Sequence, residues 1–214
     1  MPLSILDDKL WFPPATDALQ DGLLAIGGDL SEERLLLAYR NGIFPWFEDD
    51  VPLWWCPDPR FVLFPQQLKV SKSMHRILRS NHFQFKINSS FENVIHYCKT
   101  AERDHEGTWI TDEVKRAYIN LYKNDYAFCA ETWQNNNLVG GLYGIKMGKV
   151  FFGESMFSLV SNASKFAFIN YVYQLMEEGT ELIDCQVYTS HLESLGADMI
   201  SREYFLNLLK NYIP

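Results

Sequence analysis

Proline is distributed very unevenly along this chain of 214 residues. Eight of the nine prolines lie within residues 1–65, and the ninth is the terminal Pro214. Four of the six tryptophans also fall within the first 55 residues. Because proline interrupts helix interiors and central strands, this division favours two substructures. We predict a small N-terminal domain over residues 1–62 and a larger domain over residues 63–214.

The charged residues are unevenly distributed as well. The chain has 19 Lys and Arg against 27 Asp and Glu, a net charge of −8 that taken alone argues against a nucleic-acid partner. Residues 59–91, however, contain six bases and no acid, so the remainder holds 13 bases and 27 acids. Lys72, Arg76 and Arg79 share one face of a helix predicted over residues 71–79. That face is either a solvated helix surface or a patch that contacts phosphates.

Hydrophobic spacing predicts a mixture of helices and strands. The predicted helices cover residues 31–41, 91–99, 111–122 and 162–178, and a last one starts at Ser201. The predicted strands cover residues 126–133, 138–147, 149–153 and 181–187. This order gives an antiparallel meander, a long helix and a further strand, which is an α+β fold. Acyltransferases whose sheet opens to admit an acyl donor have this order of elements.

Two polar positions stand out within apolar strands. Asp184 and Gln186 lie two residues apart, so a regular strand places them on one face. Glu154 follows Gly153 in a run of aromatic residues. A carboxylate among apolar neighbours needs partners or a chemical purpose. Each acid is therefore either a buried, paired structural group or part of an active site.

Apolar residues near Glu154 also allow two interpretations. Leu142, Phe151 and Met156 are either ordinary core residues or the wall of a pocket for a flexible apolar side chain. Phe44 and Trp46 lie beside prolines in the N-terminal segment. Such rings either seal a small domain against its neighbour or form a stacking surface for an unpaired base.

Several classes of site are absent from the sequence. The four cysteines are far apart and the five histidines lack metal-ligand spacing, so we expect no metal and reduced thiols in the cytoplasm. No apolar run reaches the ~18 to 20 residues of a membrane span, and no secretory signal is apparent. Residues 160–165 lack the glycines that cradle the pyrophosphate of coenzyme A. We therefore expect no cofactor.

Seven motifs occur in an order that identifies a family. They are residues 21–31 (DGLLAIGGDLS), 41–47 (NGIFPWF), 54–60 (WWCPDPR), 107–110 (GTWI), 153–158 (GESMFS), 162–165 (NASK) and 184–187 (DCQV). In these motifs the chain resembles the leucyl/phenylalanyl-tRNA–protein transferases, and the resemblance spans residues 11–205.

The resemblance implies an activity and a fold. It implies an enzyme that moves Leu or Phe, and Met less well, from aminoacyl-tRNA to the α-amine of proteins that begin with Arg or Lys. This transfer marks the acceptor for degradation by the bacterial N-end rule. The family also implies a GNAT-like catalytic domain behind the small N-terminal domain. We expect the enzyme to act as a monomer without a membrane or a metal.

The motifs also imply roles for particular residues. Glu154, Asp184 and Gln186 match the catalytic and acceptor-binding positions, and the two acids supply negative charge for a basic acceptor. Asp184 either polarises Gln186 or holds the acceptor. Leu142, Phe151 and Met156 match the amino-acid pocket. The residues that match the aminoacyl-adenosine end are Phe44 and Trp46, with Tyr39, Trp109 and Tyr118 in support. Lys72, Arg76 and Arg79 are then the tRNA phosphate contacts.

The sequence departs from the family pattern at three positions, and two other functions stay open. Phe128 and Cys129 stand where relatives commonly have His and Ser, and Leu142 stands where Met is common. These departures concern selectivity among Leu, Phe and Met. The alternative functions are a coenzyme A-dependent N-acyltransferase of the GNAT type, and a non-catalytic module that binds RNA or peptide.

Overall fold

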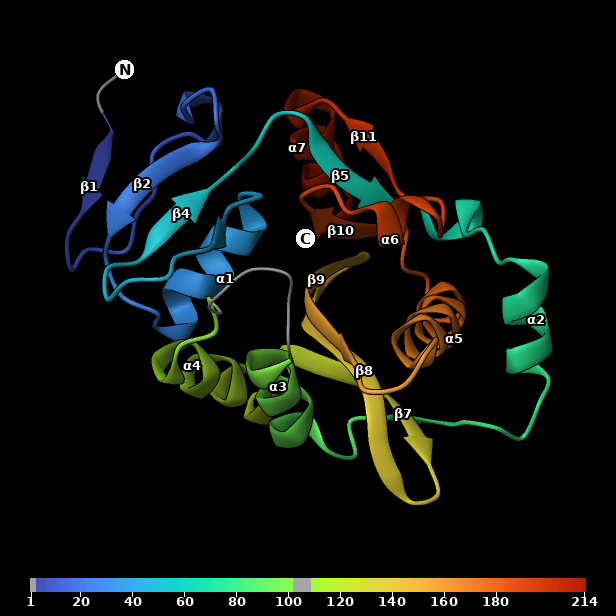
Figure 1. Ribbon diagram of the computed structural model, residues 1–214. Coiled ribbons are helices and arrows are strands. Elements are labelled where there is room, and N and C mark those ends of the chain that lie inside the picture. The colour runs from blue at the N-terminus through green and yellow to red at the C-terminus, as the bar shows by residue number, and fades with distance from the viewer. Residues whose placement is uncertain (1–2, 102–108) are drawn as a thin grey trace.

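Two sheets lie side by side in the computed structural model, which describes residues 3–101 and 109–214 (Figure 1). The first sheet is built from the N-terminal segment and is four-stranded. In spatial order its strands are β1 (Ser4–Leu6), β2 (Leu23–Gly27), β4 (Leu53–Trp55) and β3 (Phe44–Pro45). These short strands have no periodicity that sequence analysis could detect, and we did not predict them.

The second sheet is seven-stranded and is built from residues 60–200. In spatial order its strands are β11 (Asp198–Ile200), β5 (Arg60–Leu63), β10 (Leu182–Gln186), β9 (Val150–Ser158), β8 (Asn137–Met147), β7 (Ala127–Gln134) and β6 (Gln84–Ile87). Strands β7, β8 and β9 form the predicted antiparallel meander, although β9 continues to Ser158 beyond its predicted end at residue 153. Strands β9 and β10 run parallel. The long helix α5 connects the two parallel strands. This arrangement confirms the predicted α+β fold.

The helices cover the second sheet and join it to the first. They are α1 (Glu32–Arg40), α2 (Lys72–Leu78), α3 (Phe91–Thr100), α4 (Asp112–Lys123), α5 (Ala163–Glu177), α6 (Ser190–Glu193) and α7 (Arg202–Tyr212), with 3-10 turns η1 (Ala15–Asp17) and η2 (Pro65–Gln67). The side chains of Ser31, Ser71, Thr111 and Ser201 each accept a backbone N–H at a helix start. All helices predicted from spacing are present.

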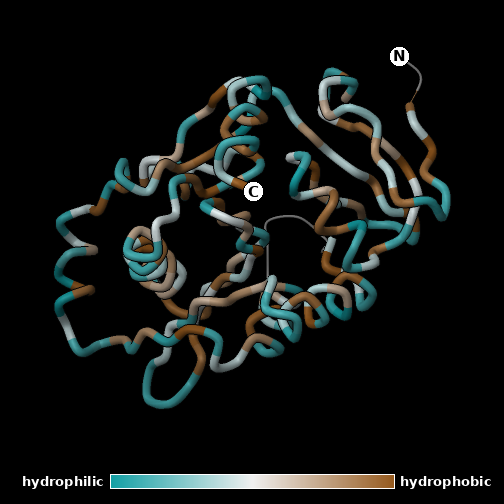
Figure 2. Tube along the Cα trace, turned by 180° about the vertical axis from the view of Figure 1, so that it is seen from behind, coloured by the Kyte–Doolittle hydropathy of each residue, from teal (hydrophilic) through white to brown (hydrophobic). Residues whose placement is uncertain are grey.

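Buried residues run continuously from one sheet to the other. One core cluster contains Leu24 and Trp54 of the first sheet together with Tyr143 and Phe152 of the second. Strand β5 starts at Arg60 and spans the predicted boundary, so the division at residues 62 and 63 stays a prediction. Hydrophilic residues gather at the outer turns, for example in the β7–β8 hairpin (Figure 2). No helix in the described residues is long and apolar enough to cross a membrane.

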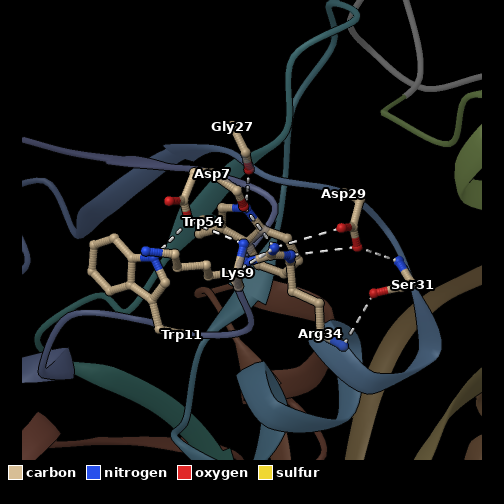
Figure 3. Close-up of polar contacts among 8 residues, drawn as sticks. All are labelled: Asp7, Lys9, Trp11, Gly27, Asp29, Ser31, Arg34 and Trp54. Atoms are coloured by element: carbon tan, nitrogen blue, oxygen red, sulfur yellow. Dashed lines mark hydrogen bonds and ion pairs between the residues drawn. The ribbon is translucent and has the colours of Figure 1, made fainter.

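A buried arginine organises the loops of the first sheet (Figure 3). Arg34 on α1 is only 1% exposed, and its Nη2 donates to the carbonyls of Asp7 at 2.9 Å and Lys9 at 3.0 Å. Its Nε lies 3.4 Å from Oδ1 of Asp29, whose side chain is 52% exposed. Gly28 has φ of +74°, and the guanidinium of Arg34 packs against it. A Cβ added at this position would lie only 3.0 Å from the guanidinium.

Candidate active site

A pocket of about 440 Å³ opens between β8, β9, β10 and the start of α5. Strand β3, Trp109 and the segment around α6 complete its wall. Most of the lining residues are apolar, and two polar ones, Glu154 and Gln186, lie where β9 and β10 diverge. A concave apolar site with few polar groups is typical of a ligand pocket.

The apolar wall contains the three residues predicted for an amino-acid pocket. Leu142 on β8 lies opposite Met156 on β9, and Phe151 lies further along β9. Ile183 on β10 and Phe168 on α5 extend the same wall, and sequence analysis missed both. Their signal was hidden because buried apolar residues on a strand or helix look the same whether they face a core or a cavity.

The sheet opens at the polar end of the pocket. The parallel pairing of β9 and β10 ends where Asp184 faces Phe152. Beyond this point the side chain of Gln186 spans the opening, and its Nε2 donates to Glu154 Oε1 at 2.9 Å. An ionised carboxylate only accepts hydrogen bonds, so the amide nitrogen must face Glu154 and the amide oxygen remains as the acceptor.

Glu154 forms no direct ion pair among the described residues, yet it is well hydrogen-bonded. Tyr118 donates to its Oε2 at 2.9 Å, and the hydroxyl of Tyr118 in turn contacts that of Tyr39. Burial raises the pKa of Glu154 to about 7, against the hydrogen bonds from the tyrosines and Gln186, which lower it. A carboxylate with this pKa exchanges its proton near neutral pH.

Asp184 is held differently, and one expectation about it is wrong. Its carboxylate is completely buried and accepts from Arg60 Nε at 2.8 Å and Nη2 at 2.6 Å. It does not line the pocket. Asp184 therefore has no free charge for a basic acceptor. Arg60, which the sequence grouped with the basic segment, is likewise 0% exposed and is no part of a surface patch.

The predicted aromatic residues divide into two sets. Phe44, Trp46 and Trp109 line the pocket. Tyr39 and Tyr118 are fully buried behind Glu154. Burial, followed by the charge of Glu154, raises the pKa of both hydroxyls. They support the site without forming its wall. Gly107 and Thr108, which precede Trp109 in its motif, lie outside the described residues.

The basic helix lies apart from the pocket. Lys72 and Arg76 on α2 are exposed, as is Arg79 at its C-terminal end, while Met74 is buried beneath them. Helix α2 packs beside α5 at the edge of the molecule farthest from the first sheet (Figure 1). None of the three bases lines the pocket, so any contact with tRNA phosphates is remote from the reacting groups.

Two further pocket residues were not singled out from the sequence. His191 at α6 lines the pocket, and its Nε2 is buried without a hydrogen-bond partner among the described residues. Burial, followed by the charge of Lys165, lowers the pKa of this histidine. The thiol of Cys185 also faces the pocket, where burial raises its pKa strongly. This thiol is poorly suited to act as a nucleophile.

The opened sheet, the apolar pocket and the carboxylate–amide pair define an acyltransferase. The chain belongs to the leucyl/phenylalanyl-tRNA protein transferase family, whose model matches residues 62–210, and the model of that family's N-terminal domain matches residues 28–58.

Curated relatives with the name leucyl/phenylalanyl-tRNA–protein transferase are similar over nearly the whole chain. The relative from Flavobacterium johnsoniae is 54% identical, covering 94% of this chain and 96% of its own. The relative from Syntrophus aciditrophicus is 53% identical, covering 98% and 89%. A solved GCN5-related N-acetyltransferase from Kribbella flavida has a TM-score of 0.39 at 12% identity, covering 76% of this chain and 58% of its own.

Proposed function

We propose that this protein transfers Leu or Phe, and Met less well, from aminoacyl-tRNA to the α-amine of proteins that begin with Arg or Lys. The observation that carries this proposal is the pocket, in which an apolar wall leads to the Glu154–Gln186 pair. The wall accepts the donor side chain, and the polar pair meets the reacting ester and amine. Family membership supports the choice of aminoacyl-tRNA as donor.

The reaction itself needs little chemical activation. The donor ester is already activated, and the acceptor amine has an ordinary pKa of roughly 7.7 to 8.0, so about a tenth of it is neutral at pH 7. The amine nitrogen attacks the ester carbonyl, a C–N bond forms and the bond to the ribose oxygen breaks. One proton leaves the amine and one reaches the ribose oxygen. We therefore assign most of the rate to positioning and electrostatics.

Gln186 and Glu154 have different roles toward the acceptor amine. The free amide oxygen of Gln186 accepts an N–H bond from the amine and aims its lone pair at the ester. Glu154, with its pKa near that of the amine, accepts the proton that the amine loses. It is also the only carboxylate on the described part of the pocket wall, and it supplies the charge for an Arg or Lys at the acceptor's first position.

The tRNA contacts two separate parts of the protein in this proposal. Phe44, Trp46 and Trp109 stack against the terminal adenosine, as aromatic rings commonly do with unpaired bases. Lys72, Arg76 and Arg79 contact phosphates further along the tRNA. The remainder of the chain has 13 bases and 27 acids, and this net negative charge suits a cationic acceptor. We further propose a cytoplasmic monomer that works in N-end-rule degradation.

The decisive experiment supplies both substrates. Purified protein is incubated with Leu-tRNA and a peptide that begins with Arg, and the Leu-Arg product is sought by mass spectrometry. A peptide that begins with Ala is the matched control. Product with the Arg peptide alone supports the proposal, whereas no product with either peptide contradicts it. Acetyl transfer from acetyl-coenzyme A would instead support the N-acyltransferase alternative, and tRNA binding without transfer would support a binding module.

A further inference from the structure

Arg60 is buried directly behind the active-site strand. It begins β5, which pairs with β10, and its guanidinium makes two parallel hydrogen bonds to Asp184. Both side chains have no exposed surface. Burial by itself would lower the pKa of Arg60, but the charge and hydrogen bonds of Asp184 outweigh it and raise that pKa. The pair is thus a fixed, internally neutralised unit.

The next contact leads from Asp184 to the backbone of Gln186. Asp184 Oδ1 accepts the backbone N–H of Gln186 at 2.9 Å. Gln186 has φ of +63°, a left-handed conformation that residues other than glycine and asparagine rarely adopt. The register of β10 against β5 shifts at the same place. A strained residue of this kind needs surrounding contacts to fix it, and the carboxylate of Asp184 supplies one.

The left-handed turn decides where the side chain of Gln186 points. Asp184 is turned into the core, while Gln186 lines the pocket and bonds to Glu154. A continuous series of contacts therefore runs from Arg60 through Asp184 and Gln186 to Glu154. Arg60 itself lines no part of the described pocket wall.

The same guanidinium also supports the aromatic wall. Its central carbon lies 4.7 Å from the ring centre of Phe44 and 4.6 Å from that of Phe205 on α7. Phe44 also lines the pocket. Arg60 thus stands between the last helix and the pocket wall, and a planar cation fits this position better than the flexible ammonium of lysine.

We propose that Arg60 is a positioning residue for the transfer reaction, acting by holding Asp184 so that Asp184 fixes the left-handed backbone of Gln186. In this arrangement Asp184 neither takes up a proton nor binds the acceptor. Its function is to accept one backbone N–H. The inference rests on the proposed transferase activity, because that activity supplies the rate to be measured.

Two double variants separate positioning from simple stability. Arg60→Met with Asp184→Asn and Arg60→Met with Asp184→Leu both remove the ion pair and both charges. Only the Asn variant keeps an oxygen that can accept the backbone N–H of Gln186. Replacing both members of a buried ion pair by neutral groups often preserves the fold, so both variants are suitable for kinetics once their melting temperatures are known.

The expected result is a difference in kcat. The Leu variant should lose about 100-fold in kcat, the scale expected for misplaced reacting groups, while the Asn variant should stay within about tenfold of the wild type. KM for Leu-tRNA should change much less than kcat in both. Arg60→Lys, which keeps the charge but loses the paired geometry, should fall between them.

A matched control comes from the other buried arginine. Arg34→Lys disturbs a buried guanidinium on α1, outside the described pocket wall, and should leave kcat unchanged. Equal kcat in the Asn and Leu variants would overturn the positioning role. The positioning role would also be overturned if Arg60→Lys and the Leu double variant both had the kcat of the wild type. Absence of product from the wild type would instead refute the transferase activity itself.

Discussion

The two buried arginines of the described chain are used in different ways. Arg34 on α1, beside the first sheet, donates mainly to backbone carbonyls, and its acidic partner Asp29 is half exposed (Figure 3). Arg60 in the second sheet makes both strong hydrogen bonds to one carboxylate that is completely buried. The first arginine joins loops, and the second fixes a strand that carries an active-site amide.

This difference shows how burial changes the strength with which an arginine and an aspartate are coupled. Water can replace Arg34 as a partner of Asp29, because half of that side chain is already solvated. Arg60 and Asp184 are both completely buried, so water cannot replace either partner. The consequence is that the same chemical pair, an arginine and an aspartate, is weakly coupled in one region and strongly coupled in the other.

The largest effect is expected when each aspartate is replaced by alanine. Asp184→Ala leaves Arg60 buried without a counter-charge and should lower the free energy of unfolding by about 3–5 kcal/mol. Asp29→Ala should lower it by about 1 kcal/mol or less. Chemical denaturation of both variants measures the two values, and similar losses would remove the distinction between the regions. Turnover should fall by orders of magnitude only for Asp184→Ala.

The second prediction changes the group that Arg60 is inferred to position. Gln186→Ala removes the amide but leaves the Arg60–Asp184 pair intact. We expect turnover to fall by about 100-fold or more, with tRNA binding retained and the free energy of unfolding little changed. Single-turnover transfer and a tRNA-binding titration measure the two quantities. Normal turnover would show that the amide takes no part in the reaction.

The third prediction concerns Glu154, which forms a direct ion pair with neither arginine. Its pKa of about 7 lies above the ordinary value of 4.5, so the ionised, proton-accepting form is lost as pH falls below 7. The ratio of wild-type to Glu154→Gln rates should therefore fall about tenfold between about pH 7.5 and about pH 6. The ratio cancels the titration of the acceptor amine, which is common to both enzymes. A constant ratio would exclude ionised Glu154 as the proton acceptor.

The same pKa has a consequence for stability. Because the folded state of Glu154 binds its proton more tightly than the unfolded chain, the folded protein holds more protons between about pH 4.5 and about pH 7. The contribution of this group to stability is therefore largest at low pH and falls as pH rises through 7. Glu154→Gln should flatten that part of the stability profile, which thermal melts across the same range can measure.

The fourth prediction extends the comparison to exposed bases. Replacing Lys72, Arg76 and Arg79 by Glu should weaken tRNA use by about tenfold near physiological salt and flatten its salt dependence. A matched control reverses Arg116, Lys123 and Lys210, which carry the same total charge and lie on α4 and α7. Equal effects of the two triple variants would mean that only net charge matters, and that α2 is a solvated face.

Much of this architecture follows from the sequence, but the buried ion pair does not. The helices and the meander were predictable because apolar residues recur at helical or strand spacing over many positions. Glu154 and Gln186 were identifiable because each is polar within an apolar run. Arg60 and Asp184 are separated by 124 positions, and an arginine in a basic segment gives no sign that it is buried.

Backbone conformation was the other feature beyond prediction. Regular alternation places Asp184 and Gln186 on one face, but the left-handed φ of Gln186 alters that relation. Glutamine has no special preference for this conformation, so no local signal marks it. The short strands of the first sheet were missed for a related reason, since β3 has only two residues. Tertiary contacts, and not local pattern, determine these features.

The smallest effect is expected from a change in the apolar wall of the pocket, at Met156. Neither buried arginine contacts this residue. Met156→Ala widens the pocket beside Leu142 without changing a charge, and it should alter the preference for Leu over Val by about tenfold. Met176 on α5 is 37% exposed and offers a matched methionine. Competition between Leu-tRNA and Val-tRNA measures the preference, and Met176→Ala should leave it unchanged. If Met156→Ala also leaves it unchanged, selectivity must come from another part of the wall, such as Phe168 or Ile183.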